Sequence, residues 1–387
     1  MRVAHIIKAT GVAGAERHLL MLLPGLAARG LEIHLILLVK PRRAAEARHP
    51  MDIYADAVAA ACPENPIHVH KMTIRRHLDI GLIPALRRLL REIQPDIVHT
   101  HLLHADLFGL PAARSLSLRH APKLIMTRHN DDRFRRWPLF RQANRTLWWM
   151  VSAGIAISHS VGRFCVRVEG APAAKVRVIH YGMTPPEVTI NRGEASAALK
   201  AELKLPPDAL LPGMVCRLVE QKGVRYALTA FAQVLPHFPA AHLVIAGDGV
   251  QRRALERQAR SLGIAQNVHF LGWRRDADRV LAALDVLLMP SLWEGFGLVM
   301  LEAMAQRVPI IGSRVSSIPE VVQDGDTGRL VPPRDPAALA EAMTELLGDT
   351  ALRRHMGLLG EDRLETHFSA ETMIERTLDI YREIMRR

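Results

Sequence analysis

The residues best suited to chemistry in this 387-residue chain stand in the segment Pro290–Met304, PSLWEGFGLVMLEAM. A carboxylate at Glu294, just before two glycines, can accept hydrogen bonds from sugar hydroxyl groups. Gly295 and Gly297 let a ligand approach the backbone, and the free N–H groups of a helix starting after them favour a phosphate. Glu302 follows among apolar neighbours, where a carboxylate needs a partner such as the vicinal hydroxyls of a ribose. The alternative is that neither glutamate binds a ligand, so that Glu294 is a charge at the start of a helix and Glu302 is a solvated charge.

A second cluster places two cations after another apolar run. Arg217 and Lys222, in RLVEQKG, follow the expected strand Gly213–Cys216. A guanidinium offers a planar fork of donors and an ammonium offers a point charge, so the pair is suited to a diphosphate. Basic residues are common in loops, and the pair alone is weak evidence. The turn Ala246-Gly-Asp-Gly249 indicates a further loop between a strand and a helix.

The elements that must position these residues alternate along the chain as short apolar strands and helices. We predict an α/β protein of two Rossmann-like, doubly wound domains that face a central cleft, with ligands at the carboxyl ends of the strands. The predicted strands are Val3–Ile7, Ile33–Val39, Ile97–His101, Leu124–Thr127, Ala153–Ser158, Gly213–Cys216, His242–Ala246, Val268–Leu271, Val286–Pro290 and Pro309–Gly312. The predicted helices include Glu16–Arg29, Leu82–Ile93, Val224–Val234, Gln251–Leu262, Leu298–Ala305 and Pro336–Leu347.

The length of the chain exceeds what one hydrophobic core supports, so two domains are expected. Pro185 and Pro186 stand in a stretch without apolar periodicity, which is typical of a linker. We predict an N-terminal domain at 1–183, a linker at 184–195 and a C-terminal domain at 196–369. A final helix at 370–387 is predicted to cross back to the N-terminal domain.

The charge of the chain is uneven. Residues 1–185 hold 27 Lys and Arg against 13 Asp and Glu, a net +14, whereas the remaining residues hold 24 against 26, a net −2. The first half is therefore expected to face an anionic partner: a phospholipid surface, an acidic saccharide or a nucleic acid. Within it, Arg128–Trp149 is rich in arginine and carries three of the five tryptophans. That composition is typical of a segment on a membrane interface, and the alternative is an amphipathic helix with its aromatics packed inside.

Cysteine usage and hydropathy bound the setting of the protein. Cys62, Cys165 and Cys216 form no CxxC pair and no disulfide framework, which favours a reducing, cytosolic compartment. The first residues lack the features of a signal peptide, and no stretch has the length and apolar character of a membrane span.

Closely spaced histidines raise the alternative of a metal site. His99, His101 and His104 lie close together, and His68 and His70 form another pair two residues apart, a spacing that places two imidazoles on one face of a strand. No cluster of carboxylates or thiols joins them, so we predict no metal. Asp276-Ala-Asp278 matches a metal-binding DxD pattern, but aspartates just before a helix are better explained as residues of its positive end.

The motifs of the second half resemble family 4 glycosyltransferases, which are retaining enzymes of the GT-B fold. The resemblance rests on PSLWEGFGLVMLEAMAQRVPIIGS, on IPE at Ile318–Glu320 and on DGDTGRLVPP at Asp324–Pro333. It extends through RLVEQKG and AGDG and covers most of residues 210–335. In the first half, Gly11–Glu16 resembles the glycine-rich first loop of the family, and Thr127-Arg-His129 resembles its strand-end histidine.

Three positions depart from the family pattern. Arg307 stands where a glycine commonly precedes Val-Pro, and Ser316-Ser317 replace the usual Gly-Gly before Ile-Pro-Glu. His180-Tyr-Gly-Met replaces the frequent Asn-Gly-Val-Asp. The serine pair puts the geometry near the donor site in question.

The resemblance implies a donor site in the C-terminal domain. Arg217 and Lys222 would hold the donor diphosphate, and Glu302 would bind the ribose. The backbone amides of Gly295, Phe296 and Gly297 would meet the distal phosphate or the sugar.

The resemblance also implies the residues nearest the chemistry. Glu294 would orient the donor sugar, and His129 would lie beside the reacting centre, so these two are the catalytic candidates. Gly14 would approach the donor from the N-terminal domain.

The implied enzyme is a metal-independent transferase of the hexosyltransferase type that retains anomeric configuration. A nucleotide-sugar is its substrate and no cofactor is expected. The acceptor would be a saccharide or a lipid-linked molecule in polysaccharide, lipopolysaccharide or glycolipid synthesis, and the protein would be cytoplasmic or peripheral on the inner face of an anionic membrane.

Two alternatives to a transferase stay open from the sequence. One is a sugar-nucleotide epimerase of the same fold, which would act without an acceptor. The other is a basic nucleic-acid-binding protein, although the best motifs lie in the half with a net −2, so no nucleic-acid partner is expected.

Overall fold

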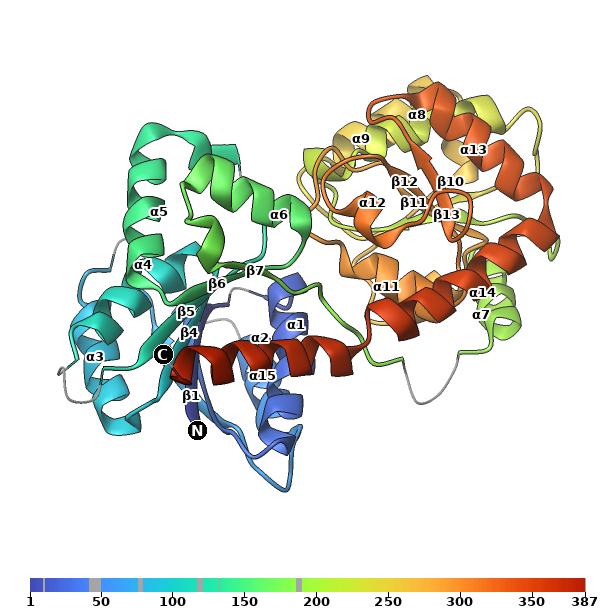
Figure 1. Ribbon diagram of the computed structural model, residues 1–387. Helices are drawn as coiled ribbons and strands as arrows, with labels where there is room; N and C mark the ends of the chain where they lie inside the picture. Colours follow the sequence, from blue (N-terminus) through green and yellow to red (C-terminus); the bar gives the residue numbers. More distant parts are fainter. Residues whose placement is uncertain are drawn as a thin grey trace. The chain divides into compact units, whose positions relative to one another are not determined.

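The structure is a computed structural model that describes residues 1–9, 11–41, 50–75, 79–116, 121–131, 133–185 and 190–386 (Figure 1). The chain divides into two compact units. Unit 1 comprises Met1–Thr184 and Ala370–Arg387, and unit 2 comprises Pro185–Ser369. Each unit is built on one parallel sheet with helices in its connections, which confirms the predicted α/β class with two doubly wound domains. Residues 186–189 of the predicted linker and Arg387 of the predicted last helix lie outside the described residues.

Unit 1 has a seven-stranded sheet in the order β3-β2-β1-β4-β5-β6-β7. The strands are β1 (Arg2–Lys8), β2 (Glu32–Val39), β3 (His68–Thr73), β4 (Ile97–His101), β5 (Lys123–Arg128), β6 (Ala153–Ala156) and β7 (Val176–Val178). Its helices are α1 (Gly14–Ala28), α2 (Pro50–Ala60), α3 (Leu82–Ile93), α4 (Leu102–Arg114), α5 (Pro138–Met150), α6 (His159–Phe164) and α15 (Ala370–Arg386). The chain order reverses between β1 and β4, so the loops after these two strands meet at a topological switch point.

Unit 2 has a six-stranded sheet in the order β10-β9-β8-β11-β12-β13. The strands are β8 (Pro212–Val215), β9 (Leu243–Ala246), β10 (Val268–Gly272), β11 (Val286–Met289), β12 (Ile310–Ser313) and β13 (Gly328–Val331). Its helices are α7 (Arg192–Glu202), α8 (Val224–Val234), α9 (Arg252–Ser261), α10 (Ala277–Ala283), α11 (Leu298–Ala305), α12 (Ile318–Val321), α13 (Pro336–Gly348) and α14 (Thr350–His367). Here the chain order reverses between β8 and β11.

The C-terminal helix α15 is part of the core of unit 1. Its buried face, which includes Ile374 and Tyr381, belongs to the same apolar cluster as α1 and the central strands. A Cβ added to Gly25 of α1 would lie 2.2 Å from Ile374, so the two helices approach closely at this glycine. Arg29, at the end of α1, forms ion pairs with Glu371 and Glu375 of α15.

Part of the arginine-rich segment Arg128–Trp149 forms a buried network rather than a surface. Arg128 and Arg135 are buried, and both form ion pairs with Glu169. The indole of Trp148 donates a hydrogen bond to the same carboxylate at 2.8 Å. Burial alone raises the pKa of Glu169, but the charges of Arg128 and Arg135 outweigh it and lower the pKa to about 2. These residues are structural, because breaking a buried pair leaves an uncompensated charge.

Other residues of the segment are exposed at the surface of unit 1. Trp137, Leu139 and Trp149 are exposed large apolar side chains on α5 and at its ends. Arg136 and Arg141 are exposed beside them in the sequence. None of the described helices combines the length and the apolar character that a transmembrane span needs.

Candidate donor and reaction site

The two loops at the switch point of unit 2 carry an ion pair. Lys222 lies in the turn after β8, Glu294 lies in the loop after β11, and the ammonium donates a hydrogen bond to the carboxylate. Both side chains are largely buried, Lys222 being 15% and Glu294 9% exposed. Two residues 72 positions apart are therefore brought together at the carboxyl edge of the sheet.

The same two loops are joined along their backbones. The N–H of Leu292 donates to the carbonyl of Gln221 at 2.8 Å, and the Gln221 side chain donates to the carbonyl of Trp293 at 3.0 Å. Gly223 has a φ of +63°, and a Cβ there would lie 1.9 Å from the carbonyl oxygen of Pro290. Only glycine fits this approach, so RLVEQKG and PSLWEGFG form one structure.

The EGFG turn combines a glycine in left-handed backbone with a buried aromatic side chain. Gly297 adopts a φ of +85° at the start of α11. The ring of Phe296 is buried, with its centroid 5.9 Å from that of Phe368. Phe296 can therefore meet a ligand only through its backbone. Gly295, the residue before it, is also buried, and Glu302 is half-buried on α11.

Arg217 differs from Lys222 in its surroundings. Its side chain is exposed, and within the described part of the chain its guanidinium forms no hydrogen bond or ion pair with another residue. The neighbouring Cys216 is half-buried, and desolvation raises the pKa of its thiol to about 11. Cys216 is therefore no nucleophile at neutral pH, whereas Arg217 is available to an anion.

In unit 1 the predicted residues lie at the carboxyl ends of β1 and β5. Gly14 is exposed at the first position of α1, and a Cβ there would meet nothing within 4 Å. His129, directly after β5, is buried. Its Nδ1 contacts the hydroxyl of Tyr181, and its Nε2 lies 3.2 Å from Nδ1 of His101. Protein groups thus engage both ring nitrogens of His129.

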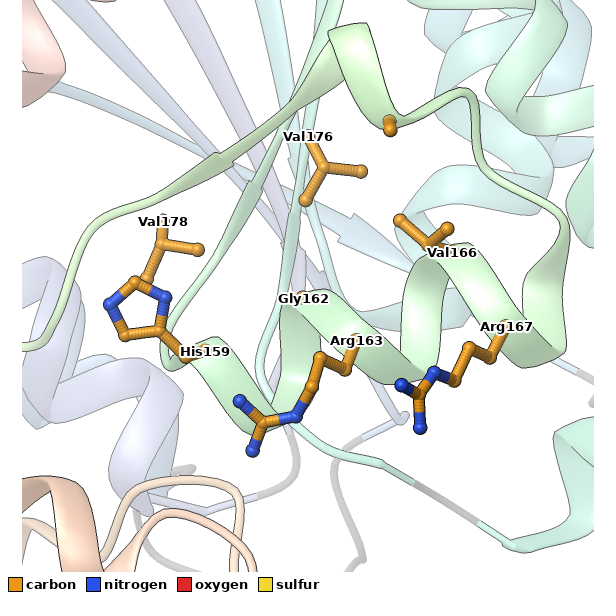
Figure 2. Close-up of a pocket in the computed structure, with 8 residues that line it drawn as sticks. His159, Gly162, Arg163, Val166, Arg167, Val176 and Val178 are labelled. Carbon is orange, nitrogen blue, oxygen red and sulfur yellow. The ribbon is translucent and has the colours of Figure 1, made fainter.

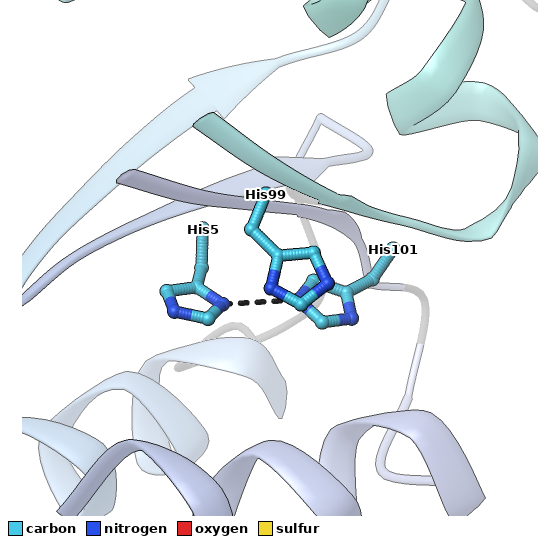
Figure 3. A group of neighbouring side chains, drawn as sticks. All are labelled: His5, His99 and His101. Atoms are coloured by element: carbon cyan, nitrogen blue, oxygen red, sulfur yellow. Dashed lines mark hydrogen bonds between the residues drawn. The ribbon is translucent and has the colours of Figure 1, made fainter. Parts of the chain in front are cut away.

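His129 belongs to a buried histidine cluster, of which the sequence indicated only His99 and His101. His5 on β1 and His99 and His101 on β4 lie side by side (Figure 3), and His18 of α1 stacks on Tyr181 at 4.6 Å. Burial lowers the pKa of His5 and of His18 to about 3. Burial, followed by the neighbouring charges, also lowers the pKa of the other three histidines well below the ordinary value. All five are therefore neutral at neutral pH.

Among the described residues, three groups have atoms close enough together to hold a metal ion, and one is His5, His99 and His101. For Asp276 and Asp278, the sequence predicts a place at the start of a helix rather than a role in metal binding. They stand at the start of α10, as expected, and Asp276 is paired with Arg274.

A pocket of about 310 Å³ lies elsewhere in unit 1, between the edge strand β7 and α6 with the helical segment Cys165–Glu169 that continues it (Figure 2). Arg163 and Arg167 line it on one side, and Val176 and Val178 line it on the other. None of the predicted donor-site residues lies in it. The pocket adds two exposed guanidinium groups to the basic unit.

Known proteins match both units. A family model described as "Glycosyltransferase Family 4" matches residues 12–185, and one described as "Glycosyl transferases group 1" matches residues 211–349. N-acetyl-alpha-D-glucosaminyl L-malate synthase of Bacillus anthracis is 27% identical over 97% of this chain and 94% of its own length. The chain belongs to the family 4 glycosyltransferases.

Further matches agree with this family 4 assignment. The lipopolysaccharide core biosynthesis glycosyltransferase LpsE of Rhizobium meliloti is 32% identical over 49% of this chain and 54% of its own length. The structure of Anabaena Alr3699/HepE in complex with UDP and glucose superposes with a TM-score of 0.82 at 19% identity, over 99% of this chain and 100% of the other. The fold is therefore GT-B.

Two of the departures from the family pattern fall where the backbone favours glycine. Arg307 has a φ of +54° and Ser316 has a φ of +48°, in the left-handed region that costs a side chain free energy. Ser317, the second residue of the serine pair, is fully buried. Its hydroxyl lies 3.1 Å from the carbonyl oxygen of Glu294 and 3.2 Å from that of Phe296. In this family 4 enzyme the hydroxyl of Ser317, in the neighbouring loop, therefore stabilises the EGFG turn.

We expect Ser317→Ala to loosen the EGFG turn. The change removes one hydroxyl donor from two buried carbonyl groups and should cost about 1–2 kcal/mol of unfolding free energy. Amide hydrogen exchange at Gly295–Gly297 should accelerate. Ser261→Ala is a control, because it removes a hydroxyl that donates to a carbonyl at the exposed end of α9. Unchanged exchange at the turn in Ser317→Ala would contradict this role.

We also expect unit 1 to lose stability as the pH falls below about 6.5. The buried histidines stay neutral in the folded chain but gain protons in the unfolded chain, so the unfolded state binds more protons. Each should reduce the free energy of unfolding by about 1.4 kcal/mol per pH unit between pH 6.5 and its folded pKa. Denaturant unfolding at pH 7.5, 6.5 and 5.5, followed by tryptophan fluorescence, measures the slope.

His18→Gln should reduce the slope of unfolding free energy against pH by about 1.4 kcal/mol per pH unit, the contribution of one proton. His355→Gln, which changes an exposed histidine of unit 2, should leave it unchanged. An unfolding free energy that stays constant from pH 7.5 to 5.5 would show that the cluster takes up protons in the folded state.

Proposed function

We propose that this family 4 glycosyltransferase transfers a hexose-type sugar from a nucleoside diphosphate donor bound to unit 2, with retention of anomeric configuration and without a metal ion. The observation that carries the proposal is the Lys222–Glu294 pair at the switch point of unit 2, beside the exposed Arg217. Family membership favours transfer over epimerisation and over nucleic-acid binding.

Positive charge for the leaving diphosphate comes from the chain itself. An ammonium has three donors, so Lys222 keeps donors for phosphate oxygens while it holds Glu294. Arg217 adds a fork of donors, and the N–H groups at the start of α11 add a partial positive charge. Such preorganised donors stabilise the charge that develops on the leaving group.

Glu294 is held for contact with the sugar. Lys222 bonds to its Oε2, which leaves Oε1 as an acceptor for a sugar hydroxyl. Glu302, half-buried on α11, is the candidate for the ribose hydroxyls. The HepE structure is a complex with UDP and glucose, which supports a nucleoside diphosphate and a hexose as the ligand class.

The acceptor that we propose is a lipid-linked saccharide or glycolipid, met at an anionic membrane surface. Residues 1–185 carry a net +14, and Trp137, Leu139 and Trp149 are exposed beside Arg136 and Arg141. Amphipathic aromatics with basic residues favour the interfacial region of a bilayer. The similarity to LpsE, a lipopolysaccharide core enzyme, supports the same class of acceptor.

The donor assignment is tested by calorimetry with UDP, GDP and ADP. Arg217→Ala should weaken binding of the preferred nucleotide by about 1.5–3 kcal/mol, because one charge-assisted contact is lost. Arg260→Ala is the control, since it removes an exposed arginine from the last turn of α9, outside the loops of the candidate donor site. Transfer should persist with a chelator present. If Arg217→Ala binds all three nucleotides like the parent, the assignment is wrong.

The acceptor assignment is tested by co-sedimentation with vesicles. Binding should rise with the fraction of anionic lipid and fall as salt increases, because each basic residue near the surface contributes about 1 kcal/mol and is screened. The double variant Arg136→Glu with Arg141→Glu should reduce it, whereas Arg257→Glu with Arg260→Glu in unit 2 should not. Equal binding to neutral and anionic vesicles, or none to either, points to a soluble acceptor.

A further inference from the structure

The buried histidines of unit 1 form one continuous series of polar contacts. Starting at β5, Oγ1 of Thr127 lies 2.7 Å from Nε2 of His99, and Nδ1 of His99 lies 2.6 Å from the hydroxyl of Tyr381. That hydroxyl lies 3.4 Å from Nε2 of His5, whose Nδ1 is 3.0 Å from Nε2 of His101. From His101 the series continues at 3.2 Å to His129 and from there to the hydroxyl of Tyr181.

Every imidazole enters this series at Nε2 and leaves it at Nδ1. A neutral imidazole has one N–H donor and one lone pair, so each contact between two rings needs a donor from one and an acceptor from the other. His5, His101 and His129 must then carry their protons on the same kind of nitrogen. The phenol of Tyr381 accepts from one neighbour and donates to the other, which extends the same sense to His99.

We propose that these residues act as one directional hydrogen-bonded chain, in which Tyr381 of α15 is a positioning residue for His129. The chain has two allowed senses. In one, all four imidazoles are protonated at Nε2, and in the other all four are protonated at Nδ1. The consequence for catalysis rests on the proposed function, because it requires His129 to lie beside the reacting centre. The shared tautomer does not depend on that function.

Tyr381 brings a polar group of the last helix into this core. Its hydroxyl links His99 to His5 in the hydrogen-bonded chain, and its ring is fully buried. Without the hydroxyl, two ring nitrogens lose a partner in the protein interior, where an unpaired polar group is costly. A change on α15 should therefore alter the ring of His129, which stands three contacts away.

A metal ion at His5, His99 and His101 is the competing arrangement. A metal would take the lone pairs of Nδ1 of His5 and Nε2 of His101, which face each other at 3.0 Å, and would replace the hydrogen bond between them. The two arrangements exclude each other. Elemental analysis of the purified chain distinguishes them, and stoichiometric zinc that is lost in His5→Gln would overturn the hydrogen-bonded chain.

The hydrogen-bonded chain is tested by nitrogen NMR of histidine-labelled protein, in which imidazole signals report which nitrogen carries the proton. In the parent, His5, His101 and His129 should show one shared tautomer, and any mixture among these three would overturn the proposal. Tyr381→Phe should shift the ring signals of His99, His5 and His129. Tyr54→Phe is the matched control, because it removes a buried hydroxyl that donates to the carbonyl of Glu16, outside the series.

A second variant keeps the test decisive if Tyr381→Phe folds poorly. Thr127→Val keeps the shape of the side chain and removes the hydroxyl at the far end, so it should also change the signals of His99 and, through Tyr381, those of His129. If the signals of His129 are unchanged in both variants, Tyr381 does not position it.

Activity gives a separate readout. Tyr381→Phe should lower kcat about two- to tenfold, the factor that one net hydrogen bond supplies, while calorimetric binding of the nucleotide to unit 2 stays at the parent value. Unchanged kcat together with shifted ring signals would overturn the positioning role and confine the series to a structural one. A parent without transferase activity would refute the proposed function and leave the shared tautomer intact.

Discussion

The adjacency of two strands at a switch point is the constraint on which the donor site depends. In unit 2, β8 and β11 lie side by side although three connections separate them along the chain. Their loops therefore meet at the carboxyl edge, where Lys222 forms an ion pair with Glu294. The close approach of Gly223 to Pro290 holds the loops at this spacing. If the two strands were separated, the cations and the carboxylate would be unrelated surface charges.

In unit 1 the two neighbouring strands at the switch point bring histidines together instead of an ion pair. At its switch point β1 lies beside β4, so His5 is paired in register with His99 and lies near His101. Imidazoles in a core lose hydration, and the cost is limited because each nitrogen in the series finds a partner. Sheet, C-terminal helix and the loop after β5 are thus joined by polar contacts rather than by apolar packing alone.

Two departures from the family pattern place residues with side chains where the backbone favours glycine. Arg307 and Ser316 occupy left-handed backbone, which costs each about 1 kcal/mol relative to glycine. Arg307 forms an ion pair with Glu361 of α14. The next residue after Ser316, Ser317, contributes the hydroxyl that binds the carbonyl groups of the EGFG turn. A change that raised a question in the sequence is thus part of the structure that supports the turn.

The sequence by itself determined the alternation of strands and helices, the α/β class and the family, because apolar periodicity and glycine-bounded motifs are local properties. It did not predict β3, β7 or β13, because each is an edge strand that contains a basic residue and therefore lacks a continuous apolar run. It left open whether Arg128–Trp149 lies on a membrane interface or packs its aromatics inside. Burial divides the segment, because Trp148 is buried with Arg128 and Arg135 whereas Trp137 is exposed. Strand order decided which residues became neighbours. His5, His99 and Tyr381 are distant along the chain, and only the folded sheet and α15 bring them within hydrogen-bonding range. Contacts between distant residues depend on strand order and packing, and local periodicity does not encode either.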